Sequence, residues 1–219
     1  MRLLVFLGSA RRSSPPRPPR LGERVALACV RQLEAGGHAV TLVDPLELDT
    51  GQAFRPHFAY PEGRAPAALD ALAQRIGEAD AYVMVSPEYN HSMSPALAHL
   101  LNHFGSSLYS FRPSAIVTYS AGQWGGVRAA VGMRTFLSEL GCLPVSAMVH
   151  VPKAQDVFDA DGRCADGGDA RRWEDYLGRT FAQLLWWAGG AARMRDEQDP
   201  QSLSPAFLRT PSQRNAPED

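Results

Sequence analysis

Three short segments of this chain carry residue types that bind phosphate groups and flat rings. The first, residues 8–20, contains Ser9, Arg11 and further serines and arginines among four prolines. Serine hydroxyls and guanidinium groups form charge-assisted hydrogen bonds with phosphate, and the free N–H groups of a following helix favour an anion. The segment therefore predicts a phosphate site, but it lacks the GxxxxGK(S/T) motif of kinases and NTPases. The simpler alternative is a proline- and arginine-rich linker that binds nothing.

The second segment, Ser86-Pro87-Glu88-Tyr89-Asn90, directly follows an apolar run. Pro87 restricts the backbone, Tyr89 offers a ring, and Asn90 can both donate and accept hydrogen bonds. A flat heterocycle would use such residues for stacking and for hydrogen bonds at its edge. An ordinary proline–asparagine turn is the alternative explanation of the same residues.

The third segment, residues 120–126, has the sequence Ser-Ala-Gly-Gln-Trp-Gly-Gly. Its glycines allow the backbone to approach a ligand closely. Its N–H groups precede another expected helix, where they could stabilise negative charge on a reduced cofactor. A plain glycine turn without a ligand is the alternative.

Each segment follows a run of residues that is typical of a buried parallel strand. The largely apolar runs occupy residues 3–7, 39–43, 81–85, 114–119 and 145–151. Helical spacing of apolar residues between them predicts helices over 21–35, 66–79, 94–108, 127–140 and 169–189. The same spacing places Leu108, Val127, Val131 and Trp187 on inward helix faces.

Five strands that alternate with helices predict an α/β fold with a doubly wound parallel sheet and helices on both faces. Two strand orders are common in such sheets. The flavodoxin-like order 2-1-3-4-5 is favoured over the six-stranded order, because there are only five strands and no glycine fingerprint of the dinucleotide-binding type. Ligands of such sheets bind outside the carboxyl ends of the strands, at the switch point between the first and third strands. All three segments fall at this place, so each supports the others. We expect one domain over residues 1–195 and a disordered tail over 196–219.

The composition indicates which cellular compartment and which binding partners can be expected for this protein. The 219 residues carry a formal net charge of −1, so no basic field indicates nucleic acid. No segment approaches the roughly 20 apolar residues of a membrane span. Cys29, Cys142 and Cys164 are widely spaced and form no CxxC pair, which predicts free thiols in a reducing compartment. We therefore expect a soluble, cytoplasmic protein with no nucleic-acid or membrane partner.

The three segments together resemble the NADPH-dependent FMN reductase family, which includes quinone, azo-dye and chromate reductases. The resemblance is carried by Gly8-Ser9-Ala10-Arg11, by residues 86–95 (SPEYNHSMSP) and by residues 119–128 (YSAGQWGGVR), and it extends over roughly residues 1–190. It implies FMN as the bound cofactor and NADPH as the electron donor.

The resemblance also implies roles for individual residues. Ser9 and Arg11 would hold the FMN phosphate, with Ser14 or Arg20 in the last phosphate position. The ring would be lined by Pro87, Glu88, Tyr89 and Asn90, and its other edge would meet Ser120, Gly122, Gly125 and Gly126. One departure from the family is that residues 11–20 delay the start of the first helix, so FMN affinity is the property most affected.

A ping-pong reaction follows from the resemblance, in which NADPH reduces FMN and leaves before a small acceptor takes the electrons. The acceptor classes are a flavin, a quinone, an azo compound or a metal oxyanion. The flavin performs the hydride chemistry, so no catalytic side chain is predicted. One alternative is a non-enzymatic flavin-binding module that senses redox state or binds a protein. Another is a family member that no longer holds FMN.

The resemblance further implies a homodimer or homotetramer, with residues 46–64 and the helix over 127–140 as candidate contacts. Trp173, Trp186 and Trp187 are expected in the core or at a subunit contact. The histidines at 91, 99 and 103 have no acidic or cysteine ligand set nearby, so they predict no metal site. The arginines at 11, 12, 17 and 20 could also meet the 2′-phosphate of NADPH.

Overall fold

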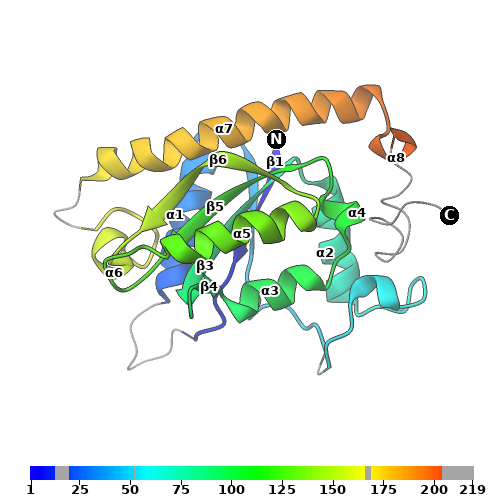
Figure 1. Cartoon of the computed structure of the whole chain (residues 1–219), viewed down its shortest axis with the longest axis horizontal. Helices are drawn as coiled ribbons and strands as arrows, with labels where there is room; N and C mark the ends of the chain where they lie inside the picture. Colours follow the sequence, from blue (N-terminus) through cyan, green and yellow to red (C-terminus); the bar gives the residue numbers. More distant parts are fainter. Residues whose placement is uncertain (13–19, 52, 166–168, 204–219) are drawn as a thin grey trace.

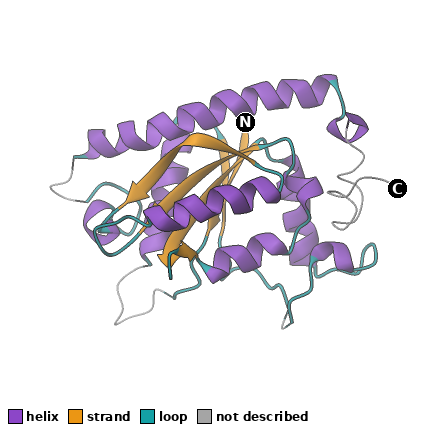
Figure 2. Cartoon of the chain, viewed as in Figure 1, coloured by secondary structure: helices purple, strands orange, loops and turns teal. Residues whose placement is uncertain are grey.

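Five parallel strands form the centre of the computed structural model, which describes residues 1–12, 20–51, 53–165 and 169–203 (Figures 1 and 2). Their bounds are β1 (Arg2–Leu7), β2 (Ala39–Val43), β3 (Ala81–Tyr89), β5 (Pro113–Tyr119) and β6 (Leu143–Val151). They lie in the order β2-β1-β3-β5-β6, while the short β4 (Ser92–Met93) pairs antiparallel with β3. Without that hairpin, the sheet has the predicted flavodoxin-like order, so the predicted fold class is confirmed.

Burial of the strands explains why the apolar runs could be recognised. All seven residues of β5 are buried, as are the five residues of β1 that follow Arg2. These strands lie inside the sheet and are covered on both faces, so nearly every side chain is apolar. The edge strands β2 and β6 contain exposed and half-buried positions, because one side of each meets no further strand.

Helices cover both faces of the sheet and enclose two apolar cores (Figure 2). One face packs against α1 (Leu21–Ala35), α6 (Ala154–Val157) and α7 (Ala170–Glu197). The other packs against α2 (Ala67–Glu78), α3 (Pro95–Asn102), α4 (Ser106–Tyr109) and α5 (Val127–Glu139). The remaining elements are the 3₁₀ helix η1 (His57–Ala59) and α8 (Pro200–Leu203).

The structure corrects the predicted helix over 94–108. The helix α3 ends at Asn102, and Leu108 lies on the separate short helix α4. Gly105, at the start of α4, has extended backbone angles that no continuous helix contains. The helical spacing of apolar residues continues across the break between α3 and α4, so it could not be recognised from the sequence pattern.

The predicted inward positions Val127, Val131 and Trp187 are also wrong. Val131 is 64% exposed, and Val127 and Trp187 are exposed as well. In α5 the buried stripe consists of Ala129, Ala130, Met133 and Leu137. Small alanines allow α5 to approach the sheet closely, whereas the prediction gave more weight to the larger valines.

The last long helix extends beyond the predicted end at residue 189. It continues to Glu197, and α8 follows at Pro200–Leu203. The rest of the tail predicted from residue 196, namely 204–219, lies outside the described residues. Within the described part of the chain, every helix is too short or too polar to cross a bilayer.

Candidate functional site

A cavity of about 180 Å³ lies at the carboxyl ends of β1, β3 and β5, at the switch point of the sheet. Seven of the predicted site residues line it: Ser9, Arg11, Arg20, Pro87, Glu88, Tyr89 and Ser120. They come from all three predicted segments, and more than 100 positions of the sequence separate Ser9 from Ser120. The structure therefore brings the three segments together, as parallel strands require.

The first loop is fastened to the neighbouring strand and helix by hydrogen bonds. The Gly8 N–H donates to the Val85 carbonyl over 2.7 Å, and the Ser94 hydroxyl donates to the Gly8 carbonyl over 2.6 Å. Ser94 also caps α3, because its Oγ accepts from the Leu97 N–H at 3.0 Å. Ser9 is buried, and its Oγ accepts from the Arg11 N–H at 3.4 Å. These hydrogen bonds hold residues 8–11, the described start of the loop, beside the cavity.

Arg20 stabilises this loop through hydrogen bonds. Its guanidinium donates to both carboxylate oxygens of Asp44, at 2.5 and 3.1 Å, and also to the Ser9 carbonyl. Both side chains of this ion pair are buried. Asp44 in turn accepts from the Leu46 N–H at 2.9 Å. Arg20 lines the cavity. The N–H groups that bond to Asp44 and Ser9 are used within the protein and do not point to a ligand in the cavity.

The segment predicted as the second loop is instead the end of β3, where Glu88 and Tyr89 pair with β4. It brings an aromatic side chain and a paired carboxylate to the cavity. Tyr89 and Pro87 both line the cavity, Tyr89 as an exposed side chain and Pro87 as a buried one. The Glu88 carboxylate accepts from the Arg128 N–H at 3.2 Å and lies 3.5 Å from its guanidinium. The Arg128 guanidinium lies 5.5 Å from the centre of the Trp124 ring. Glu88 therefore joins the end of β3 to the start of α5.

Asn90 directly follows the cavity-lining residues Glu88 and Tyr89 but does not itself line the cavity. Asn90 and His91 form the two-residue turn between β3 and β4, with φ angles of 50° and 62°. Positive φ at both positions is the geometry of a tight hairpin turn. Asn90 is exposed and is not among the residues that line the cavity.

The third loop contributes Ser120 to the cavity, but none of its glycines. The Ser120 hydroxyl donates to the Gly122 carbonyl at 2.8 Å and accepts from the Gly125 N–H at 2.9 Å. Gly125 and Gly126 have φ angles of 61° and 77°. A Cβ at Gly126 would lie 2.9 Å from the Cβ of Thr118. These glycines let the loop turn sharply against the sheet.

Sequence reasoning did not single out three of the lining residues, Leu21, Tyr119 and Ala121. Burial raises the pKa of the Tyr119 phenol, and a hydrogen bond with Ser9 partly offsets this rise. Asp44 was also missed, although its position directly after a strand at the carboxyl edge was a usable signal. The predicted phosphate residue Ser14 lies outside the described residues.

The buried cysteines take no part in this site. Burial raises the pKa of the Cys29 and Cys142 thiols to about 12, so both remain protonated at neutral pH. A protonated thiol is a poor nucleophile. All three cysteines of the chain are free, as predicted.

Lowering the pH is expected to weaken the fold behind the third loop. His150 is half-buried beside Gly125, and its Nδ1 lies 2.8 Å from the Thr118 hydroxyl oxygen. Burial lowers the pKa of His150 below its ordinary value of 6.5. Below that value the unfolded chain binds more protons at this position than the folded chain does. The free energy of unfolding therefore decreases as the pH falls through 6.5 and recovers above it.

Urea unfolding at several pH values measures this effect, with the variant His150→Gln as the comparison. The variant should show a smaller loss of stability between neutral and mildly acidic pH. The exposed His91→Gln serves as the control and should follow the wild type. Identical pH dependence in His150→Gln and the wild type would show that His150 contributes nothing to it.

Comparison with known proteins identifies the family of this chain. Residues 1–156 match the family model for NADPH-dependent FMN reductase. An NAD(P)H-dependent FMN reductase from Pseudomonas aeruginosa is 34% identical over 105 residues, which are 46% of this chain and 57% of that protein. A probable NADPH:quinone oxidoreductase from Oryza sativa subsp. japonica is 30% identical over 126 residues, or 53% of this chain and 61% of that protein. The matched segments thus span about 60% of these relatives.

The fold has a counterpart among solved structures. The flavoenzyme NAD(P)H:(acceptor) oxidoreductase FerB from Paracoccus denitrificans superposes with a TM-score of 0.64. The superposition covers 85% of this chain and 96% of that one, at 20% sequence identity. Similarity at this identity supports the fold alone. Because the family model spans most of the chain and includes all three segments of the cavity, this chain belongs to the NADPH-dependent FMN reductase family.

Proposed function

We propose that this protein binds FMN at the cavity between β1, β3 and β5 and transfers electrons from NAD(P)H to a small acceptor. One observation carries the proposal: anion-binding and ring-binding residues from three distant segments line the same cavity at the sheet's switch point. The relatives from Pseudomonas aeruginosa and Oryza sativa are named for the same class of reaction. The acceptor class is a flavin, quinone, azo compound or metal oxyanion.

The side chains that line the cavity are of the kinds that bind the phosphate and the ring of FMN. The Ser9 hydroxyl and the exposed Arg11 side chain offer donors for a phosphate at one end of the cavity. Tyr89 and Pro87 offer flat and apolar surface at the other end. The cavity of about 180 Å³ is smaller than a typical ligand pocket of about 300–1,000 Å³. We therefore propose that the phosphate end is enclosed and that the ring rests on an open surface.

When bound, FMN would supply hydride acceptance and electron release. The protein's own residues hold the phosphate, orient the ring and keep one face open, so we assign no side chain as acid or base. Glu88 is paired with Arg128 and thereby fixes the start of α5 beside the ring. Asn90, Gly122, Gly125 and Gly126 would shape the loops around the ring, with Ser14 as a further phosphate candidate.

The nicotinamide donor would bind over the open face. Arg11, which lines the cavity, and its neighbour Arg12 are both exposed and are the proposed contacts for the 2′-phosphate of NADPH. Arg20 is a weaker candidate because it is buried against Asp44, and Arg17 lies outside the described residues. We assign the activity to one domain of residues 1–195 and propose a cytoplasmic location, where NADPH is available.

Steady-state kinetics with NADPH and a quinone at several fixed concentrations test the proposed reaction. Parallel double-reciprocal lines are expected, because the donor leaves before the acceptor binds. Intersecting lines would show that both substrates are bound together and would exclude the ping-pong order. Bound FMN without NADPH oxidation would instead indicate a flavin-binding module that is not an enzyme.

Replacing Arg11 with alanine is expected to raise the Kd for FMN roughly 10- to 100-fold. The reason is the loss of one charge-assisted hydrogen bond to phosphate, which contributes about 1.5–3 kcal/mol. Fluorescence quenching of FMN during titration with protein measures the Kd. The exposed Arg75→Ala, on α2 near the opposite edge of the sheet, is the control and should bind FMN as the wild type does. A change of less than about twofold in Arg11→Ala would remove Arg11 from the phosphate site.

A further inference from the structure

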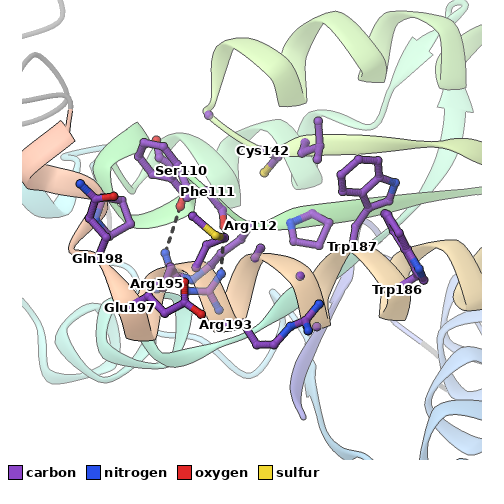
Figure 3. Close-up of a pocket in the computed structure, with 18 of the residues that line it drawn as sticks. Ser110, Phe111, Arg112, Cys142, Trp186, Trp187, Arg193, Arg195, Glu197 and Gln198 are labelled. Carbon is purple, nitrogen blue, oxygen red and sulfur yellow. Dashed lines mark hydrogen bonds between the residues drawn. The ribbon is translucent and has the colours of Figure 1, made fainter.

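A long groove lies at the edge of the sheet opposite to the flavin cavity. It has a volume of about 1240 Å³ and runs between the second half of α7 and the amino ends of β5 and β6 (Figure 3). Its lining on α7 includes Leu185 and Glu197, which are about 18 Å apart at 1.5 Å per helical residue. No described residue lines both the groove and the flavin cavity. A ligand of the groove would therefore not displace FMN.

The walls of the groove are apolar and open to solvent. Trp186 and Trp187 contribute an edge-to-face pair of rings, with centres 4.7 Å apart and planes at 90°. Phe111, Leu143 and Met194 continue the apolar surface, and all five side chains are exposed. Contiguous exposed apolar surface is typical of ligand-binding grooves, because its removal from water is favourable.

An unusual backbone conformation holds Phe111 in the wall of the groove. Its φ angle is 61°, a value that bulky residues rarely adopt. The Arg195 guanidinium of α7 donates to the Phe111 carbonyl over 2.9 Å, and the Arg112 guanidinium donates to the Ser110 carbonyl over 3.1 Å. Strained residues persist where their surroundings fix them, and they cluster at functional sites and ligand clamps. The Phe111 ring is thus positioned before any ligand binds.

Gly190 leaves space in the groove at the middle of its α7 wall. It is half-buried and lines the groove, yet a Cβ added there would meet no atom within 4 Å. Alanine favours a helix over glycine, so neither packing nor helix stability requires glycine at this position. What the glycine does provide is volume, because a larger side chain would occupy part of the groove.

Positive charge gathers on one part of the groove. Three arginines line it, Arg112, Arg193 and Arg195, together with one acid, Glu197. Burial and the charge of Arg112 lower the pKa of the Arg195 guanidinium, although Asp80 acts in the opposite direction. No ion pair within the described part of the chain includes Arg193, which is exposed. The positive charge is therefore only partly compensated by the protein.

The charged and the aromatic parts of the groove are separated along α7. Arg193 follows Trp186 by about 10 Å along the helix axis. Figure 3 shows Arg112 and Arg195 on the side of Phe111, away from the two tryptophans. A ligand that uses both parts must be elongated, with a negative charge at one end and an apolar body at the other.

We propose that this groove binds a free carboxylate with a long unbranched acyl chain. The carboxylate faces Arg193, because guanidinium and carboxylate groups form charge-assisted hydrogen bonds. The chain lies along α7 over Gly190 and ends against Trp186 and Trp187, where each buried methylene group is favourable. This site does not rest on the proposed flavin chemistry, since it lies at the opposite edge of the sheet.

Isothermal titration calorimetry of the full chain with decanoate tests the proposal. The wild type is expected to bind one molecule per chain, with the same Kd in the presence and absence of saturating FMN. Gly190→Leu fills part of the groove and should raise the Kd at least about tenfold. Gly132→Leu makes the same change at an exposed position of α5 and should leave the Kd unchanged. Thermal unfolding verifies that both variants are folded.

A comparison of decanoate with 1-decanol tests the role of Arg193. Arg193→Gln should raise the Kd for decanoate about tenfold, because one charge-assisted hydrogen bond is lost. The same variant should bind the uncharged 1-decanol as the wild type does, whereas a merely structural effect would weaken both ligands alike. Arg171→Gln, at an exposed position of α7 outside the groove, is the control and should bind both ligands normally.

Three results would overturn the proposal. If FMN displaces decanoate, the acid binds in the flavin cavity. If neither Gly190→Leu nor Arg193→Gln changes the Kd, decanoate binds elsewhere on the surface. The third is a wild-type protein that binds no decanoate. If in that case sedimentation shows that Gly190→Leu changes the oligomeric state, a second copy of the chain covers the groove; if the wild type instead binds phosphatidylglycerol vesicles, the groove faces a lipid surface.

Discussion

Replacing Asp44 with alanine is expected to lower the free energy of unfolding by about 3–5 kcal/mol. The carboxylate of Asp44 is the buried counter-ion of Arg20, and removing it leaves a guanidinium charge without compensation inside the protein. Breaking a buried ion pair from one side has this cost because the remaining charge is still desolvated. Urea unfolding followed by circular dichroism measures the change.

The exposed pair Arg163–Asp161 supplies the matched control. Its two side chains are 54% and 71% exposed, so water and salt screen the attraction. Asp161→Ala should therefore change the free energy of unfolding by no more than about 1 kcal/mol. A loss in Asp44→Ala as small as that of the control would show that the Arg20–Asp44 pair does not stabilise the fold.

The Asp44→Ala variant should also lose affinity for FMN. Arg20 bonds both to Asp44 and to the Ser9 carbonyl, so the carboxylate holds the guanidinium where it can support the first loop. Without that support, the Ser9 hydroxyl and the Arg11 side chain lose their fixed spacing. FMN titration of the folded variant, below its unfolding transition, separates this effect from the loss of stability.

Gly8→Ala is expected to have the second large effect, a loss of FMN affinity of at least about tenfold combined with destabilisation of about 1–3 kcal/mol. A Cβ at Gly8 would lie 2.6 Å from the Val85 carbonyl oxygen and 2.9 Å from the Leu97 Cβ. Both neighbours belong to packed elements, so the loop itself must move. That movement disrupts the hydrogen bonds of Gly8 with Val85 and Ser94, which fix the first loop.

Gly132→Ala in α5 is the control for this substitution. A Cβ at Gly132 meets no atom within 4 Å, and alanine favours a helix over glycine by up to about 1 kcal/mol. The control should therefore be at least as stable as the wild type and bind FMN equally well. If Gly8→Ala also binds FMN with unchanged affinity, then the first loop does not hold the phosphate.

Much of the fold could be predicted because burial on both faces makes the central strands apolar throughout. The apolar runs in β1, β3 and β5 could therefore be recognised. Alternation with helices indicated a doubly wound sheet, and the strand number and the missing dinucleotide-binding glycine motif favoured its order. The hairpin of β3 and β4 was missed because its turn is Asn90-His91, without the glycine that usually marks positive φ. The inward face of α5 was misassigned because alanines at close contact carry a weak apolar signal.

The sequence predicted which segments form the candidate site, but it did not predict the contacts between their side chains. Ser9 and Ser120 were recognised because they follow β1 and β5, and Pro87 because it lies near the carboxyl end of β3, at the same edge of the sheet. The pairing of Arg20 with Asp44 joins residues that are 24 positions apart. It depends on how the loop after β1 packs against the end of β2, and local patterns do not encode that packing.

One measurement tests the central claim most directly. The visible absorption spectrum of FMN is recorded as the protein is added, and again after anaerobic addition of NADPH. The account predicts that the flavin bands shift on binding and then bleach with NADPH. No bound flavin at a large excess of FMN would contradict the proposed site, and the reductase function would have to be abandoned.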